Sequence, residues 1–357
     1  MIRNIESIKN ELLITALKAV EHKVTPGGVI GVVYGNGQRI TIPFGRYTYE
    51  ENSKIVKEDT MYDLASITKS IPTNSIALKL IDEGKLKLDD KLIDYIPEFN
   101  NSDRDRVMIK HLLTYSLDGY GLASLGTNKM NYNEMYNIIM NKDFKNRPGE
   151  IFKYSNVPSF LLGLVIEKIT GEKLDILADK MFFKKLGMSH TTFYPEIFNS
   201  LDIPPTEINS WYGLVQGHVH DESTWMCKQG GHTVGHSGVF SNAADILNFL
   251  EMLLGGGEIN GHRYLSESIV KQIETNQIPH LNDFTGLGFE LNQPRYMSDK
   301  CTDKTFGKTG FTGTLIVCDR EKGIAYTLLT NRTYPHRQPD SKAINELRKA
   351  VGDILLR

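Results

Sequence analysis

The first residues that could do chemistry are Ser66 and Lys69, in the segment Ser66-Ile67-Thr68-Lys69. The segment has helical periodicity, so this spacing places the hydroxyl and the amine on one helix face, about one turn apart. A serine hydroxyl needs a base before it can act as a nucleophile, and a lysine with a lowered pKa can be that base. Backbone N–H groups at a helix N-terminus would stabilise the resulting anion. A helix-capping serine beside a solvated lysine has the same pattern.

A second candidate is the pair Tyr154 and Asn156, which follows Arg147-Pro148-Gly149-Glu150 and begins a helical segment. A phenol close to two ammonium groups is expected to have a lowered pKa and to act as a general base. The Asn156 amide offers both a donor and an acceptor for a substrate or a lysine. A half-buried packing tyrosine followed by a helix N-cap is the alternative.

The third candidate is Lys308-Thr309-Gly310, at the start of a predicted hairpin. A lysine and a threonine at a strand edge can bind a substrate carboxylate. Gly310 has no side chain, so an extended ligand could approach and add to the sheet as a further strand. A glycine-rich turn with a surface lysine is the alternative.

The three motifs occur in the order Ser-x-x-Lys, Tyr-x-Asn, Lys-Thr-Gly, and together they resemble those of the penicillin-recognising serine hydrolases. The second motif, Tyr-x-Asn, is similar to that of the class C β-lactamases, their low-molecular-weight D,D-peptidase relatives and the related esterases. Segments such as IKHLLTYSLDG, KKLGMSHTTF and GHVHDE also resemble this family, and the resemblance covers roughly residues 25 to 335.

The resemblance implies that Ser66 is acylated, that Lys69 takes or relays its proton, and that Tyr154 is the general base and later activates water. The backbone N–H groups of Ser66 and Phe311 would form the oxyanion hole. The residues implied to bind substrate are Asn156, Lys308, Thr309 and Gly310. The family further implies no metal, no organic cofactor, and a small-molecule or peptide substrate with an amide or ester bond.

The pattern of elements is consistent with this family. Residues 27–45 predict a hairpin turning at Asn36-Gly37, and residues 314–317 and 324–329 predict a second one. Amphipathic helices are predicted at both ends of the chain. Helical periodicity covers residues 66–83, 107–115, 131–141, 156–170, 173–183 and 243–254.

The predicted fold class is therefore α+β, of the β-lactamase/transpeptidase type: an antiparallel sheet flanked by helices, with an inserted, mostly helical domain. We expect residues 1–70 and 236–357 to form the sheet domain and residues 71–235 to form the insert. The active site is expected at their junction.

Composition limits the possible partners. The 357 residues include 41 basic and 43 acidic side chains, so the net charge of −2 indicates neither nucleic-acid binding nor an anionic membrane surface. The strongest apolar run, residues 160–166, is too short for a membrane span. Glu6 and Glu11 interrupt what would be the apolar core of a signal peptide, which predicts a cytoplasmic location unless a leader precedes this sequence. The sequence does not indicate the oligomeric state.

Three other interpretations stay open. A metallohydrolase would use the histidine-rich region of His218, His220, His232 and His236. An α/β-hydrolase elbow is weakly suggested by residues 235–239, although the closing glycine is missing. A non-turnover penicillin-binding or sensor protein would keep the same motifs but hydrolyse its acyl-enzyme very slowly.

Substrate preference is expected to depend on loops around residues 117–130 and 205–230. The second loop carries Trp211, Tyr212 and Trp225, which could form either an aromatic wall or core packing. The bulky Phe311 could narrow the acyl site.

Overall fold

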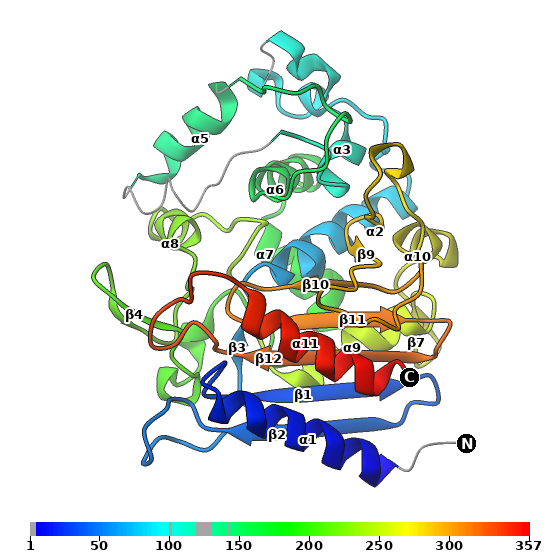
Figure 1. The fold of residues 1–357 in the computed structure, drawn as a ribbon. Coiled ribbons are helices and arrows are strands. Elements are labelled where there is room, and N and C mark those ends of the chain that lie inside the picture. Colours follow the sequence, from blue (N-terminus) through cyan, green and yellow to red (C-terminus); the bar gives the residue numbers. More distant parts are fainter. Residues whose placement is uncertain (1–4, 100–101, 119–129, 142) are drawn as a thin grey trace.

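The computed structural model describes residues 5–99, 102–118, 130–141 and 143–357. Its centre is a six-stranded antiparallel sheet with the order β2-β1-β12-β11-β10-β9 (Figure 1). The strands are β1 (Gly27–Tyr34), β2 (Arg39–Gly45), β9 (Glu290–Leu291), β10 (Phe306–Thr309), β11 (Leu315–Asp319) and β12 (Ile324–Thr330). Both predicted hairpins are confirmed, and Gly37 adopts the positive φ that the first turn requires.

Helices cover both faces of this sheet. The terminal helices α1 (Ile5–Glu21) and α11 (Lys342–Leu355) lie next to each other on one face, in front of the sheet in Figure 1. The helix α9 (Ala243–Leu254) packs on β1 and β12. Side chains alternate along β1, so Ile30 and Val32 join the core beneath α1 and α11, while Val29 and Val33 join the core that contains α9. The predicted fold class is confirmed, with a sheet built from both ends of the chain.

Most of the remaining helices lie between β2 and β9 in the sequence. They are α2 (Ser75–Asp82), α3 (Ile109–Leu113), α5 (Tyr132–Asn141), α6 (Val157–Thr170), α7 (Leu174–Ala178), α8 (Glu222–Gln229) and α10 (Glu267–Ile273). The π-helical segments are η1 (Lys69–Asn74) and η5 (Asp179–Phe183), and the 3-10 turns are η2 (Leu92–Asp94), η3 (Pro97–Phe99), η4 (Ser102–Arg106), η6 (Pro195–Ile197), η7 (Ser200–Asp202) and η8 (Pro279–Leu281). Short strand pairs join β3 (Tyr62–Asp63) to β6 (Phe240–Ser241), β4 (Glu207–Asn209) to β5 (Gly213–Val215), and β7 (Glu258–Ile259) to β8 (His262–Arg263). The proposed domain boundaries stay a prediction.

The predicted helix over residues 66–83 is interrupted. Ile71 is extended, with φ −121° and ψ 106°, so the backbone is broken within η1, before the regular helix α2 begins at Ser75. Pro72 is the cause, because proline lacks an N–H group and disfavours helical backbone at the residue before it. The segment that carries Lys69 is therefore a short helical turn with its own orientation.

Among the residues that the structure describes, no helix combines the length and apolar character needed to cross a bilayer. The cytoplasmic location stays a prediction.

The contact between α11 and the sheet predicts an unusual substitution effect at Gly352. In a helix interior, alanine is normally more stable than glycine by about 1 kcal/mol. Here an added Cβ would lie 1.6 Å from the Met297 carbonyl oxygen and 2.6 Å from the Tyr326 hydroxyl. Gly352→Ala should therefore lower the free energy of unfolding by about 1–3 kcal/mol in urea denaturation. The control Glu346→Ala, exposed on the same helix, should not. Stabilisation by Gly352→Ala would show that this close packing is wrong.

Candidate active site

Ser66 and Lys69 form a direct hydrogen bond. Ser66 follows β3 and immediately precedes the helical residues that begin at 67. The Lys69 Nζ donates to Ser66 Oγ at 2.9 Å and to the carbonyl oxygen of His236 at 2.8 Å. The predicted spacing therefore brings the hydroxyl and the amine together.

The surroundings of Lys69 favour its uncharged form. The side chain is completely buried, and this burial lowers the pKa of its amine well below the usual 10.5. The positive charge of Lys308 lowers that pKa further, while Asp221 and Glu290 oppose the shift. An unprotonated amine beside a serine hydroxyl is an available proton acceptor.

Tyr154 lies beside both lysines. Its ring centroid is 4.3 Å from the Lys308 Nζ and 5.3 Å from the Lys69 Nζ, and its side chain is hydrogen-bonded to Ser66. The expected lowering of its pKa is wrong. Desolvation of the phenol raises that pKa, and the Ser66 hydrogen bond only partly opposes the rise, although the residue as a whole is 42% exposed. The phenol is therefore protonated at neutral pH.

Lys308 is part of a buried ion pair that the sequence motif did not reveal. Its Nζ lies 2.6 Å from Glu290 Oε1, and the Tyr296 hydroxyl donates to the other carboxylate oxygen. Burial raises the pKa of Glu290, but Lys308 and Tyr296 outweigh it, so the net pKa is below the usual value. The charge of Lys308 is thus already paired with a carboxylate.

The loop after β10 is tied to the segment that carries the nucleophile. The Thr312 hydroxyl donates to the Asp63 carbonyl at 2.7 Å, and the Thr314 hydroxyl donates to the Leu64 carbonyl at 3.0 Å. Gly310 is required here, because a Cβ would lie 2.0 Å from Thr314 Oγ1 and 2.4 Å from the Leu64 carbonyl oxygen. These bonds fix the backbone of Phe311 relative to the segment leading into Ser66.

The other predicted substrate-binding residues are at the ends of elements. Thr309 is the half-buried last residue of β10, paired with Leu315 of β11. Asn156 precedes α6, and its half-buried side chain does not cap that helix. The Asn156 amide is therefore not used for helix capping. The substrate-binding roles of both residues remain predictions.

Asp63 is a second buried carboxylate that the motifs did not reveal. Its two oxygens accept the backbone N–H groups of Ala65 and His220, each at 2.8 Å. Burial raises the pKa of Asp63 to about 6, with the two hydrogen bonds opposing the rise. Asp63 thus holds the turn before Ser66, in which Ala65 adopts a positive φ of 47°. The only sequence signal was an acidic residue in an otherwise apolar segment.

The four histidines of the metallohydrolase interpretation have separate surroundings. His236 Nε2 lies near the hydroxyls of Ser223 and Thr224, His220 Nδ1 is 3.1 Å from Thr206 Oγ1, and the His232 ring stacks on Tyr132. The centroid of the His218 ring is 5.5 Å from the centroid of the Tyr212 ring. Within the described residues, no group of three or more His, Cys, Asp or Glu side chains is placed to hold a metal ion.

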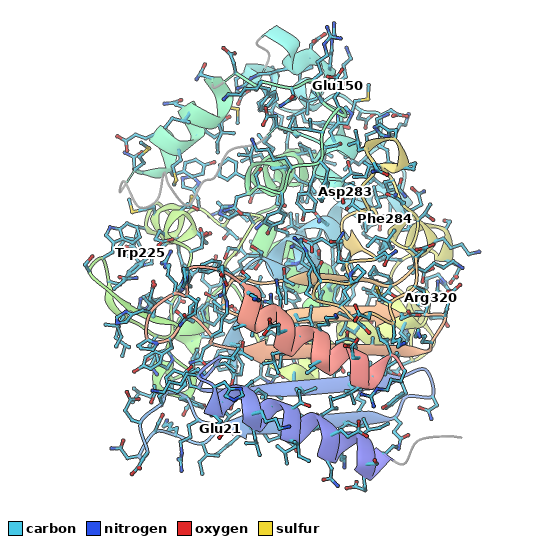
Figure 2. All side chains as sticks on the ribbon, in the orientation of Figure 1. Glu21, Glu150, Trp225, Asp283, Phe284 and Arg320 are labelled. Carbon is cyan, nitrogen blue, oxygen red and sulfur yellow. The ribbon has the colours of Figure 1, made fainter. Side chains whose placement is uncertain are left out.

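The aromatic residues of the second loop form one half-buried cluster. The Trp225 centroid is 5.5 Å from Trp211 and 5.0 Å from Tyr212. Trp225, labelled in Figure 2, belongs to α8, and its partners lie at the β4–β5 turn. Of the other loop expected to influence specificity, residues 119–129 lie outside the described part of the chain.

Comparison with known proteins identifies the family. The family described as Beta-lactamase matches residues 16–350. A putative D-alanyl-D-alanine carboxypeptidase of Escherichia coli K12 is 31% identical over 309 residues, covering 78% of this chain and 70% of the relative. A protein of the same description from Salmonella agona is 30% identical over 318 residues, covering 80% and 72%. This chain belongs to the Beta-lactamase family, whose members include hydrolases of the serine β-lactamase and penicillin-binding-protein kind.

Solved structures share the fold. EstCE1, described as a hydrolase with promiscuous acyltransferase activity, aligns with a TM-score of 0.77 at 18% identity, covering 97% of this chain and 99% of that one. The octameric penicillin-binding protein homologue from Pyrococcus abyssi aligns with a TM-score of 0.75 at 24% identity, covering 96% and 77%. At these identities the likeness supports the fold alone.

The Lys308–Glu290 ion pair predicts a large stability effect. Removing one partner of a buried pair leaves an uncompensated charge and costs about 3–5 kcal/mol. Glu290→Gln should lower the free energy of unfolding in urea by that amount, and Lys308→Met added to it should restore most of the loss. The control Glu321→Gln, in the exposed pair with Lys304, should change stability little. Equal losses in Glu290→Gln and Glu321→Gln would contradict the assignment.

Proposed function

We propose that this protein is a serine hydrolase that forms an acyl-enzyme at Ser66 on a small ester or amide substrate. The observation that carries the proposal is the 2.9 Å contact between Ser66 Oγ and the Nζ of Lys69, a lysine whose burial favours the unprotonated form. In this arrangement the proton of the nucleophile has an acceptor within hydrogen-bond distance before substrate arrives.

In acylation, Lys69 Nζ accepts the Ser66 proton as Oγ bonds to the substrate carbonyl carbon. The electron pair of the carbonyl moves to its oxygen, and the N–H groups of Ser66 and Phe311 stabilise that oxyanion. When the intermediate collapses, the bond to the leaving group breaks and the Tyr154 phenol protonates the leaving group. Because its pKa is raised, Tyr154 is protonated at neutral pH and therefore carries the proton that this step requires.

In deacylation, the Tyr154 phenolate takes a proton from water as the water oxygen attacks the acyl carbon. The second intermediate expels Ser66 Oγ, which recovers its proton from the Lys69 ammonium. Both groups then have their starting protonation states, so the cycle needs neither metal nor cofactor.

For the substrate, two observations support different candidates. The relatives named as putative D-alanyl-D-alanine carboxypeptidases support a D-amino-acid peptide with a free carboxylate. The Lys308–Glu290 pair supports an uncharged ester instead, because it leaves little net positive charge to attract a carboxylate. Phe311, 44% exposed beside the proposed oxyanion site, adds apolar surface for an acyl group. We favour small esters, with D-amino-acid peptides as the second candidate.

The nucleophile is tested by labelling and by a substrate screen. A fluorophosphonate should label Ser66, located by peptide mass spectrometry, and Ser66→Ala should lose hydrolysis of p-nitrophenyl esters, nitrocefin, D-Ala-D-Ala peptides and D-amino acid amides alike. Ser237→Ala is the matched serine control, since this buried serine is outside the proposed mechanism. Hydrolysis retained by Ser66→Ala would overturn the proposal. A persistent adduct at Ser66 without turnover of any substrate would identify a non-turnover sensor instead.

The base is tested by pH dependence. Lys69 accepts a proton only when unprotonated, so kcat/KM for an ester should rise with pH through the pKa of Lys69 and level off above it. Because burial lowers that pKa, the plateau should begin well below pH 10.5. Tyr154→Phe should reduce kcat by about 10²–10⁴-fold yet keep this rise. Loss of the rise in Tyr154→Phe, with Lys69→Met still active, would assign the base role to Tyr154.

A further inference from the structure

Arg348 connects the C-terminal helix to the loop that follows β10. It belongs to α11 and is 3% exposed. Its Nη2 donates to the carbonyl oxygens of Gly310 at 2.7 Å and Thr314 at 2.8 Å. Its Nη1 donates to the Asn345 side-chain oxygen at 2.8 Å, one turn earlier on the helix. A residue near the end of the chain thus bridges both ends of the Gly310–Thr314 turn.

Among the residues that the structure describes, Arg348 has no carboxylate partner in an ion pair. The three hydrogen bonds of the guanidinium go to neutral oxygens, and burial together with Arg332 lowers the pKa of Arg348 to about 9. A buried cation is costly unless it is paired or fully hydrogen-bonded. Arg348 can use these hydrogen bonds to fix the orientation of the backbone at Gly310 and Thr314.

The geometry of the peptide bond converts this contact into a constraint on the site. The Gly310 carbonyl and the Phe311 N–H belong to one planar trans unit, so they point in opposite directions. Holding the carbonyl on the side of α11 therefore turns the Phe311 N–H away from α11. A positive charge on the carbonyl also polarises the unit and makes its N–H a stronger donor.

The other hydrogen bonds in this loop do not anchor the Gly310 carbonyl from outside the turn. The Gly313 N–H also donates to the Gly310 carbonyl, but at 3.1 Å, and it belongs to the same turn. Arg332 holds the carbonyls of Phe311 and Thr312, which belong to the next two peptide units. Among the described residues, Arg348 is therefore the side chain outside the loop that anchors the Gly310–Phe311 peptide unit.

We propose that Arg348 is a positioning residue for the oxyanion hole: by binding the Gly310 carbonyl, it directs the Phe311 N–H at the oxygen of the substrate attacked by Ser66. The inference rests on the proposed function, because it assumes an oxyanion at Ser66. A merely structural Arg348 would affect stability without changing transition-state binding.

The test compares Arg348→Met with Val351→Ala. Val351 is a buried residue of the same helix and packs in the core between the sheet and the helices α1 and α11. Arg348→Met should lower kcat for a p-nitrophenyl ester by at least about tenfold, and by at most the about 10²–10³-fold caused by complete loss of one oxyanion-hole donor. It should weaken binding of a boronic acid, whose tetrahedral adduct occupies the oxyanion hole, by a similar factor, with KM little changed. Val351→Ala should lower the unfolding temperature without either effect.

Fluorophosphonate labelling separates the two hypotheses. If the wild-type protein is not labelled at Ser66, the proposed function fails. If Ser66 is labelled and folded Arg348→Met keeps kcat and boronate affinity within twofold of the wild type, the role of Arg348 is overturned. Should Arg348→Met not fold, Arg348→Lys is judged by the same criterion, because a single ammonium group does not reproduce the planar guanidinium, whose Nη1 is held by Asn345 while its Nη2 holds both carbonyls.

Discussion

The proposed chemistry depends on surroundings that disfavour the charged form of a lysine beside a serine. Lys69 is completely buried, and its amine donates to the Ser66 hydroxyl and to the His236 carbonyl. Burial in low dielectric disfavours the ammonium, and the neighbouring Lys308 disfavours it further. The carboxylates of Asp221 and Glu290 limit the shift. The proposed chemistry follows from this balance, because an ammonium in the same place could not accept the serine proton.

Lys69, Lys308 and Arg348 are buried basic side chains at or near the proposed reaction centre, and each is accommodated differently. Lys69 favours the loss of its proton, Lys308 is paired with Glu290, and Arg348 is bonded to backbone carbonyls. These solutions have different functional consequences. In the proposed mechanism, the first supplies a base, the second limits the charge offered to substrate, and the third orients a peptide unit. Together these three arrangements favour a site that binds the oxyanion of the transition state more strongly than it binds a charged ligand in the ground state.

The fold brings these groups together from distant parts of the chain. The turn at Ser66 is hydrogen-bonded through Thr312 and Thr314 to the loop after β10, and that loop is held from behind by α11. The break at Ile71 leaves Lys69 on a short turn separate from α2. Each of these hydrogen bonds is accepted by a backbone carbonyl, so a small movement of one element would shift the backbone at the reaction centre.

The sequence by itself determined the local features: the hairpins, the helix positions apart from the break at Ile71, the family, and the Ser66–Lys69 contact, which follows from a spacing of one helical turn. Only the tertiary structure decided the electrostatics. The pairing of Lys308 with Glu290 depends on the register of β9 and β10, and the hold of Arg348 on Gly310 depends on α11 packing over the sheet. The direction of the Tyr154 pKa shift was mispredicted for the same reason. Desolvation depends on every atom around a group, and sequence spacing contains no information about burial.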